Sequence, residues 1–198
     1  MNIQQYYKSN HAYEFLISSN NLIEKSTIST ILSKYDFLSE RNKDNTHKKL
    51  HDFRMYIADE LDEINFLMIR CSVAIELSLK GISVSKGYNI FKFNDRKFLR
   101  YNKINANSLI DKQKTYELQF YIDNLDKLIG KNNSKKYKRM IIFFKEQRND
   151  YIHFARKQYD KNSIKILNNL KLLLVYFKKV VDPFKNKHSM KEAKLEDK

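Results

Sequence analysis

The sequence predicts an all-α protein, an up-and-down helical bundle of about five helices with one long central helix. The 198 residues include only three glycines and one proline, too few for the many turns of a sandwich, barrel or doubly wound sheet. Apolar residues also recur at intervals of three and four from Leu50 to Ile82, the spacing of one buried helix face. A chain of this length can form one domain with a substantial core.

The expected elements follow the chain in order. Residues 11–38 carry a weaker helical pattern that breaks near Ser19, and residues 39–49, which lack any apolar side chain, form a solvated connection. The long helix covers residues 46–83, roughly 55 Å at 1.5 Å per residue, so it must bend or overhang a small domain. A helix over residues 118–128 ends at Gly130, a suitable C-cap, and Ser134 is the expected N-cap of the next helix. The last helix covers residues 162–181 and ends at Pro183.

We expect a single domain over residues 1–184. Residues 1–45 form an N-terminal helical extension, and residues 88–114, where aromatic side chains alternate with charge and asparagine, form an irregular insertion. Residues 185–198 are charged and nearly free of bulky apolar side chains, which predicts a disordered tail.

The charge of the chain points to a polyanionic partner. There are 38 Lys and Arg against 23 Asp and Glu, a formal net charge of +15. The basic residues are scattered among Tyr, Phe and Asn rather than gathered on one amphipathic helix, which favours nucleic acid over a membrane surface. The alternative is that composition alone explains the charge, because Lys and Asn are abundant together with Ile, Tyr and Phe. With neither a signal-peptide pattern nor an apolar run long enough to span a membrane, we expect a cytoplasmic protein.

Several kinds of chemistry are excluded by missing motifs. The sequence has no CxxC, HExxH, Walker loop or GxGxxG pattern, so neither a metal nor a cofactor is expected. His47 and His51 stand four residues apart but lie in a lysine-rich segment without a poised third ligand. Cys71 lies on the apolar stripe of the long helix, where an inert buried thiol is expected rather than a nucleophile.

A reaction centre is suggested by RNDYIHF, residues 148–154. On a helix Asn149 and His153 share one face, while Arg148 lies about 140° from His153 and must reach round or use a bend. A similar stretch, RNKDNTH, occurs at residues 41–47, so the spacing alone proves little. That stretch lies in the solvated connection, whereas residues 148–154 follow apolar positions that can hold catalytic side chains in place.

A second pair of charges stands near the end of the long helix. Glu76 and Lys80, in the stretch IELSLKG, are four residues apart and one turn off the apolar stripe. One interpretation is an ordinary ion pair on a helix surface, which contributes a few tenths of a kcal/mol. The other interpretation, a supporting role in a reaction centre, depends on the order of this stretch and RNDYIHF along the chain.

The stretch ELSLK at residues 76–80, followed about seventy residues later by RNDYIH at residues 148–153, resembles the HEPN superfamily of helical domains. The likeness covers roughly residues 50–181. It implies a metal-independent RNA endonuclease that needs no cofactor and acts as a homodimer joining two copies of the motif. It also implies a role as a toxin of a toxin–antitoxin system or as an effector of phage defence by abortive infection, with an antitoxin or another defence protein as partner.

The resemblance also assigns roles to single residues. His153 is similar to the acid/base group, Arg148 to the group that stabilises the phosphorane charge, and Asn149 to the residue that orients them. Imidazole titrates near neutral pH and can take the 2′-OH proton, while a guanidinium can bind two phosphoryl oxygens. The expected products are a 2′,3′-cyclic phosphate and a 5′-OH. The supporting residues are Glu76, Lys80 and Tyr151.

One departure from the family concerns its control. In the subgroup that is inactivated by nucleotidylation a tyrosine follows the histidine by two positions, and this sequence has Ala155 there. We therefore do not expect that form of control. Many family members lack activity, but they usually lose the arginine or the histidine, and this chain keeps both.

The substrate-binding surface is expected beside the motif. Basic side chains that flank it are expected to guide the phosphate backbone: Lys135, Lys136, Lys138, Arg139 and Arg156. For any one of them the alternative is a solvated helix face. Residues 88–103 are either a second RNA surface, since bases stack on exposed rings, or a lid packed on the bundle. Two other functions stay open, a non-catalytic RNA-binding or scaffold protein of the same fold and a helical interaction protein.

Overall fold

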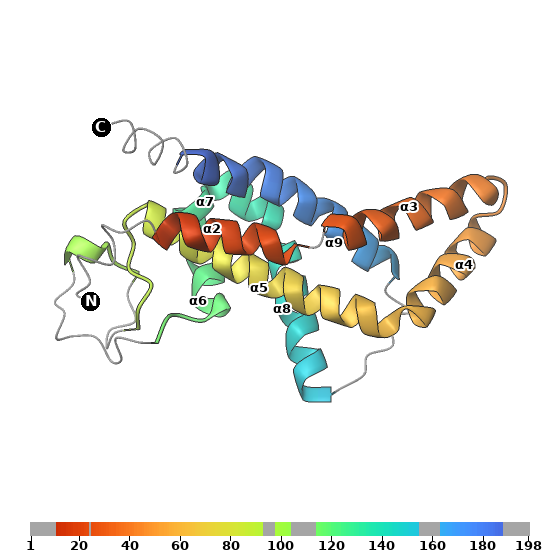
Figure 1. The fold of residues 1–198 in the computed structure, drawn as a ribbon, viewed down its shortest axis with the longest axis horizontal. Helices are drawn as coiled ribbons and strands as arrows, with labels where there is room; N and C mark the ends of the chain where they lie inside the picture. Colours follow the sequence, from red (N-terminus) through yellow and green to blue (C-terminus); the bar gives the residue numbers. More distant parts are fainter. Residues whose placement is uncertain (1–10, 24, 93–97, 104–113, 155–162, 188–198) are drawn as a thin grey trace.

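The structure, a computed structural model, describes residues 11–23, 25–92, 98–103, 114–154 and 163–187, with the backbone alone for residues 25–26 and 151–154. This part of the chain is almost entirely helical, which confirms the all-α prediction (Figure 1). The helices are α2 (His11–Leu22), α3 (Lys25–Arg41), α4 (Thr46–Asp59), α5 (Leu61–Ser85), α6 (Leu118–Asp123), α7 (Leu125–Ile129), α8 (Lys131–Phe154) and α9 (Ser163–Tyr176). None of these helices combines the length and apolar character needed to cross a membrane.

The N-terminal region packs directly against the centre of the fold. The predicted break between its two helices is present, at residue 23, a few positions after Ser19. Helix α2 lies along α5 and approaches it most closely at Gly81, where a Cβ atom would lie 2.8 Å from Leu16 Cγ and 3.0 Å from the Ala12 carbonyl oxygen. Only a residue without a side chain allows this approach.

The connection between α3 and α4 is shorter than the sequence predicts. Instead of residues 39–49, only residues 42–45 lie outside the two helices. Asn45 caps α4, because its side-chain oxygen accepts a hydrogen bond of 2.9 Å from the Lys48 N–H. The buried Asn42 bonds the Leu38 carbonyl oxygen and the Asp52 carboxylate, at 3.1 and 3.3 Å. The two helices form a hairpin at one end of the molecule (Figure 1).

The predicted continuous helix over residues 46–83 is two helices that meet at Glu60. This residue ends α4, where its N–H bonds the Tyr56 carbonyl oxygen, and it also begins α5. Asp62 and Glu63 follow in the first turn of α5, where negative side chains interact favourably with the helix dipole. The predicted bend is therefore a break. Helix α5 has 25 residues and contacts α2, α4, α6, α7 and α8, but α8 is nearly as long with 24 residues, so the prediction of one long central helix is not confirmed.

Between α5 and α6 the structure describes residues 86–92, 98–103 and 114–117, whose only helical part is a short 3-10 turn at residues 101–103. Two isolated antiparallel bridges, Tyr88 with Arg100 and Phe91 with Thr115, hold the described parts of this insertion together. The predicted helix over residues 118–128 is divided at Asn124, whose side-chain amide donates to the Phe120 carbonyl oxygen at 2.9 Å. Asparagine side chains compete in this way with the backbone bonds of a helix.

Helix α8 begins earlier than the sequence predicts. Gly130 has φ +82° and ends α7, which confirms the predicted C-cap. The next residue already starts α8, so Ser134 lies inside that helix and is not its N-cap. Buried Tyr137, Ile141 and Phe144 form its core-facing stripe, as their spacing predicts.

Helix α9 continues beyond the expected end at Pro183. Residues 177–181 form a π-helical turn, in which the Asp182 N–H bonds the Phe177 carbonyl oxygen, and residues 182–187 are helical again. A proline removes one backbone donor and its ring crowds the preceding turn, and here a wider π turn lies directly before Pro183 and the helix continues. Residues 185–187 of the expected disordered tail are therefore helical, and residues 188–198 lie outside the described part of the chain.

The arrangement of α5 and α8 determines where the site lies. Helix α8 crosses α5 instead of running beside it as in a simple up-and-down bundle, and its C-terminal end projects beyond the other helices (Figure 1). The buried side chains of both helices meet α9, which brings Tyr137 and Tyr176 into an edge-to-face contact with ring centroids 5.4 Å apart. This contact anchors the N-terminal half of α8 against the core.

Candidate functional site

Helix α5 holds the first two charged residues of the site. Ile75 and Leu79 are fully buried, and they fix the orientation of the helix. Glu76 and Lys80 lie on its half-exposed side, with Glu76 Oε1 2.8 Å from Lys80 Nζ. Their side chains are only 19% and 13% exposed, so water screens this pair less than a pair on an open surface.

Helix α8 brings the third charge to the same point. The Arg148 Nη1 atom donates to Glu76 Oε2 at 3.1 Å, across a sequence separation of 72 residues. The arginine side chain is 22% exposed. Two buried residues anchor this part of α8 against the core. Phe144 lies about one turn before Arg148, and Gln147 directly precedes it. The two motifs found in the sequence therefore meet in space at the Glu76 carboxylate.

The resulting cluster, defined as Glu76, Lys80 and Arg148, carries one negative and two positive charges. Each carboxylate oxygen binds a different cation. A guanidinium has five N–H donors and one of its nitrogens is used here, so its other edge can still bind an oxyanion. A net charge of +1 in a half-buried position favours an incoming phosphate. The simple surface-pair interpretation of Glu76 and Lys80 does not account for the bond to Arg148.

Asn149 lies next to Arg148 but on the outer side of α8, where it is half-exposed. His153 and Tyr151 lie in the last turns of α8, for which the structure describes the backbone. By helical position His153 shares a face with Asn149 and stands about 7.5 Å along the axis from Arg148. Arg156 lies outside the described residues.

The basic residues expected to guide RNA are all exposed where they are described. Lys135, Lys138 and Arg139 lie on the outer face of α8. Lys136 is exposed as well, but it stands 100° round the helix from Lys135, with its Nζ atom 5.4 Å from the centroid of the Tyr137 ring. Sequence reasoning did not include Lys131 and Lys145, which occupy the same outer face as Lys135. Lys131 stands four residues before Lys135 and Lys145 seven residues after Lys138, and this helical spacing was the available signal.

Three described aromatic side chains of residues 88–103 pack on each other or against the core, namely Tyr88, Phe91 and Phe98. Tyr88 stacks on Phe98 with ring centroids 4.5 Å apart, and Phe98 meets Phe120 edge to face at 5.3 Å. Phe98 is buried, and Tyr88 and Phe91 pack against the core. These rings favour the lid interpretation, because faces that stack on each other are not open to bases.

The structure describes the surroundings of Cys71 and His51, two residues that the sequence does not favour as reactive groups. Burial raises the pKa of the Cys71 thiol, which keeps it protonated and unreactive. His51 is exposed and lies 3.5 Å from the adjacent Asp52 carboxylate. Among the described residues no group of three or more His, Cys, Asp or Glu side chains is arranged to hold a metal ion.

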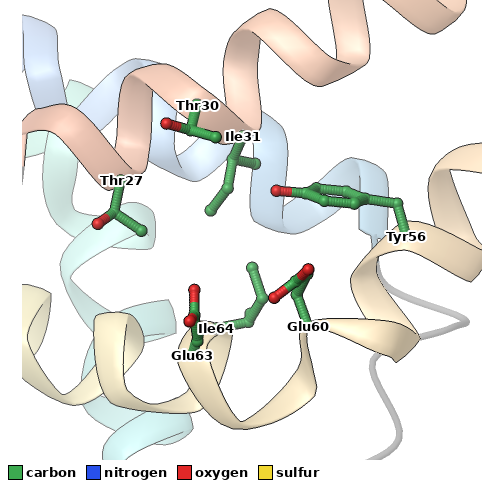
Figure 2. Close-up of a pocket in the computed structure, with 7 residues that line it drawn as sticks. All are labelled: Thr27, Thr30, Ile31, Tyr56, Glu60, Glu63 and Ile64. Carbon is green, nitrogen blue, oxygen red and sulfur yellow. The ribbon is translucent and has the colours of Figure 1, made fainter.

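A separate cavity of about 150 Å³ lies between α3 and the junction of α4 and α5 (Figure 2). It is lined by Thr27, Thr30, Ile31, Tyr56, Glu60, Glu63 and Ile64. Burial and the two nearby carboxylates raise the pKa of Tyr56. Glu63 stands about 20 Å along α5 from Glu76, so the cavity contains none of the predicted site residues.

No family model matches the chain, and no curated protein or solved structure shows significant similarity to it. The resemblance described above therefore depends on the motif residues alone.

Proposed function

We propose that the protein is a metal-independent RNA endonuclease of the HEPN type that works as a homodimer. The observation that carries this proposal is the contact between the two motifs, in which Arg148 on α8 binds Glu76 on α5 while Glu76 also binds Lys80. This half-buried carboxylate joins the two stretches on which the resemblance is based. The excess of basic residues agrees with a polyanionic substrate.

In the proposed reaction the RNA supplies its own nucleophile. The 2′-oxygen forms a bond to phosphorus and the bond to the 5′-oxygen breaks, which gives a 2′,3′-cyclic phosphate and a 5′-OH. One proton must leave the 2′-OH and one must reach the departing 5′-oxygen. We assign these two transfers to the His153 imidazoles of the two protomers, because imidazole can give or take a proton near neutral pH.

The other two motif residues act on charge and geometry in this proposal. The free edge of the Arg148 guanidinium binds the phosphoryl oxygens, whose negative charge grows in the transition state. Glu76 and Lys80 fix the position of that guanidinium through the two contacts at 3.1 and 2.8 Å. Asn149, half-exposed beside Arg148, orients the substrate or the imidazole.

A second copy of the chain is the proposed partner for the half-exposed side of α5. This side presents an apolar stripe next to Glu76, formed by Phe66, Ile69, Val73 and Leu77. Phe66 is 57% exposed, an unusual position for a large apolar side chain. Burial of this stripe against its counterpart would bring the two projecting ends of α8 near each other. Val73→Glu combined with Leu77→Glu should convert a dimer to a monomer in sedimentation velocity.

The test of the nuclease proposal is cleavage of RNA by the purified protein in excess EDTA. We expect fragments that carry a 2′,3′-cyclic phosphate and a 5′-OH, and a substrate with 2′-deoxy sugars should resist cleavage. His153→Gln should lower the rate by about 10² to 10⁴, the usual contribution of an acid/base group. Arg148→Lys keeps the charge but loses the forked geometry, and should also lower the rate strongly.

The second RN…H stretch provides a matched control. Arg41 and His47 are both exposed, so Arg41→Lys combined with His47→Gln makes the same chemical changes away from Glu76. This control should cleave at the wild-type rate. Cleavage that survives His153→Gln at full rate would disprove the assignment. Salt-sensitive RNA binding without any cleavage would favour the non-catalytic RNA-binding alternative.

A further inference from the structure

The outer face of α8 carries a row of positive charges. We call it the basic row and define it as Lys131, Lys135, Lys138, Arg139 and Lys145. All of its members are exposed except Lys145, which is half-exposed and whose Nζ atom donates to Gln119 Oε1 at 2.7 Å. The row begins at the first residue of the helix and continues toward the motif at its C-terminal end.

The spacing of these residues aligns them along the helix axis. At 100° per residue, Lys135 stands about 40° to one side of Lys131 and Lys138 about 20° to the other. Arg139 and Lys145 mark the two edges, so the whole row occupies an arc of about 120°. Asn149 falls at the same angle as Lys131, five turns later. The row therefore leads to Asn149, the neighbour of Arg148 in the candidate site.

The charges of the row have no ionic partners within the described part of the chain. None of the ion pairs between described residues includes one of these five side chains. The one carboxylate on the same face is that of Glu146. The opposite face of α8 is buried through Tyr137, Met140 and Phe144, so the row cannot turn inward to find partners.

We propose that the basic row binds the phosphate backbone of a single RNA strand and guides it along α8 from Lys131 to Asn149. This inference rests on the proposed function, which supplies RNA as the substrate. It adds that the RNA is single-stranded and that the strand follows the outer face of α8. From Lys131 to Lys145 the row is about 21 Å long, with slightly more than one cation for each turn of 5.4 Å, and the path on to Asn149 is about 27 Å. It is one strand wide, because its members lie on the convex surface of a single helix.

A duplex fits this surface poorly. The major groove of A-form RNA is deep and narrow, and a helix cannot enter it. The two backbones of a duplex would need cations on both sides of a groove, whereas the basic row offers one line of charge. A single strand can lie along that line and present its phosphates in sequence.

The size of the electrostatic contribution follows from the number of contacts. Binding of single strands weakens with salt by about 0.7 logarithmic units per phosphate contact, so five contacts give a slope of about −3.5. Loss of two contacts should reduce the slope by about 1.4 and weaken binding about 25-fold at 0.1 M salt.

The experiment measures binding apart from cleavage. A fluorescently labelled RNA that is fully 2′-O-methylated cannot undergo 2′-OH attack, and its affinity is followed by anisotropy over a range of salt concentrations. The test variant is Lys135→Gln with Lys138→Gln. The matched control is Lys178→Gln with Lys179→Gln, which removes two exposed charges from the π turn after α9. Circular dichroism verifies that both variants are folded.

In the test variant we expect a smaller salt dependence of binding and a lower affinity for the RNA. The control variant should bind as the wild-type protein does. The basic row is not an RNA path if the test variant binds as well as the wild type or if both variants lose affinity equally. The same conclusion follows if the wild-type protein does not bind the RNA. Tighter binding of the matching duplex would overturn the single-stranded assignment. If the losses occur as expected and unmodified RNA is not cleaved, the path stands and the nuclease proposal fails.

Discussion

Replacement of Glu76 by glutamine removes the carboxylate that joins α5 to α8. Lys80 and Arg148 would then face each other without the negative charge between them. An exposed ion pair contributes about 0.2–1 kcal/mol, and loss of one partner from a fully buried pair costs about 3–5 kcal/mol. The three side chains are 13–22% exposed, which lies between these limits.

We therefore expect Glu76→Gln to lower the free energy of unfolding by about 2 kcal/mol. For a chain of this size that corresponds to a fall of about 4–8 °C in the melting temperature. The measurement is urea unfolding followed by circular dichroism. A double-mutant cycle with Arg148→Met isolates the contact between α5 and α8, and we expect a coupling energy of about 1 kcal/mol.

An exposed ion pair in the same protein serves as the control cycle. Lys92 Nζ lies 3.2 Å from Glu117 Oε1, with side chains 34% and 81% exposed. The cycle of Lys92→Met with Glu117→Gln should give a coupling below about 0.5 kcal/mol. If the Glu76 and Arg148 replacements are additive within the same limit, the two motifs do not form a joint site in solution.

Three further predictions concern the core. Burial raises the pKa of Tyr176 above its ordinary value of 10.0, so the unfolded state loses its phenolic proton first and stability falls as the pH rises above 10. Tyr176→Phe also loses the 2.9 Å hydrogen bond to Ser78 Oγ, so it should lower the free energy of unfolding by about 1 kcal/mol at neutral pH. Above pH 10 the same variant should lose stability more slowly than the wild type, by up to about 1.4 kcal/mol per pH unit in urea titrations. Gly81→Ala should destabilise by about 1–3 kcal/mol, measured by thermal unfolding, because the new methyl group meets Leu16. Asn65 is fully buried and neither side-chain polar atom has a hydrogen-bond partner among the described residues, so Asn65→Leu should stabilise by about 1 kcal/mol or more in urea unfolding.

Controls separate these effects from general ones. Gly130 has φ +82° and open space around its Cβ position, so Gly130→Ala tests backbone strain without the clash expected at Gly81. A stabilising effect of Gly81→Ala would mean that α2 does not approach α5 as described. An alkaline loss of stability that is the same in Tyr176→Phe as in the wild type would contradict the assigned titration. A destabilising Asn65→Leu would show that its amide is satisfied in solution.

Much of the fold was predictable from patterns of apolar residues. The spacing from Leu50 to Ile82 correctly predicted a buried helix face, and Gly130 correctly predicted the end of α7. The boundaries were less predictable, since the break at Glu60 interrupts neither apolar spacing nor composition. Pro183 predicted a helix end, but the π turn before it lets the helix continue. Such adjustments depend on packing energies that a single sequence does not display.

For the candidate site, the sequence supplied the residues and their faces on the helices. Helical geometry alone indicated that Asn149 and His153 share a face and that Arg148 points elsewhere. It could not show what Arg148 meets, because its partner stands 72 residues earlier in the chain. The basic row was visible as a spacing in α8, but its exposure depends on which side of the helix the core covers.

The sequence by itself determined the helical class, the charge excess and the chemical identity of the motif residues. These properties are local, because they depend on side-chain chemistry and on the 3.6-residue period of a helix. Only the tertiary structure decided that α8 crosses α5, that Glu76 joins Arg148 to Lys80, and that the basic row faces outward. Contacts between distant segments result from the burial of many side chains at once, and no single stretch of sequence specifies that balance.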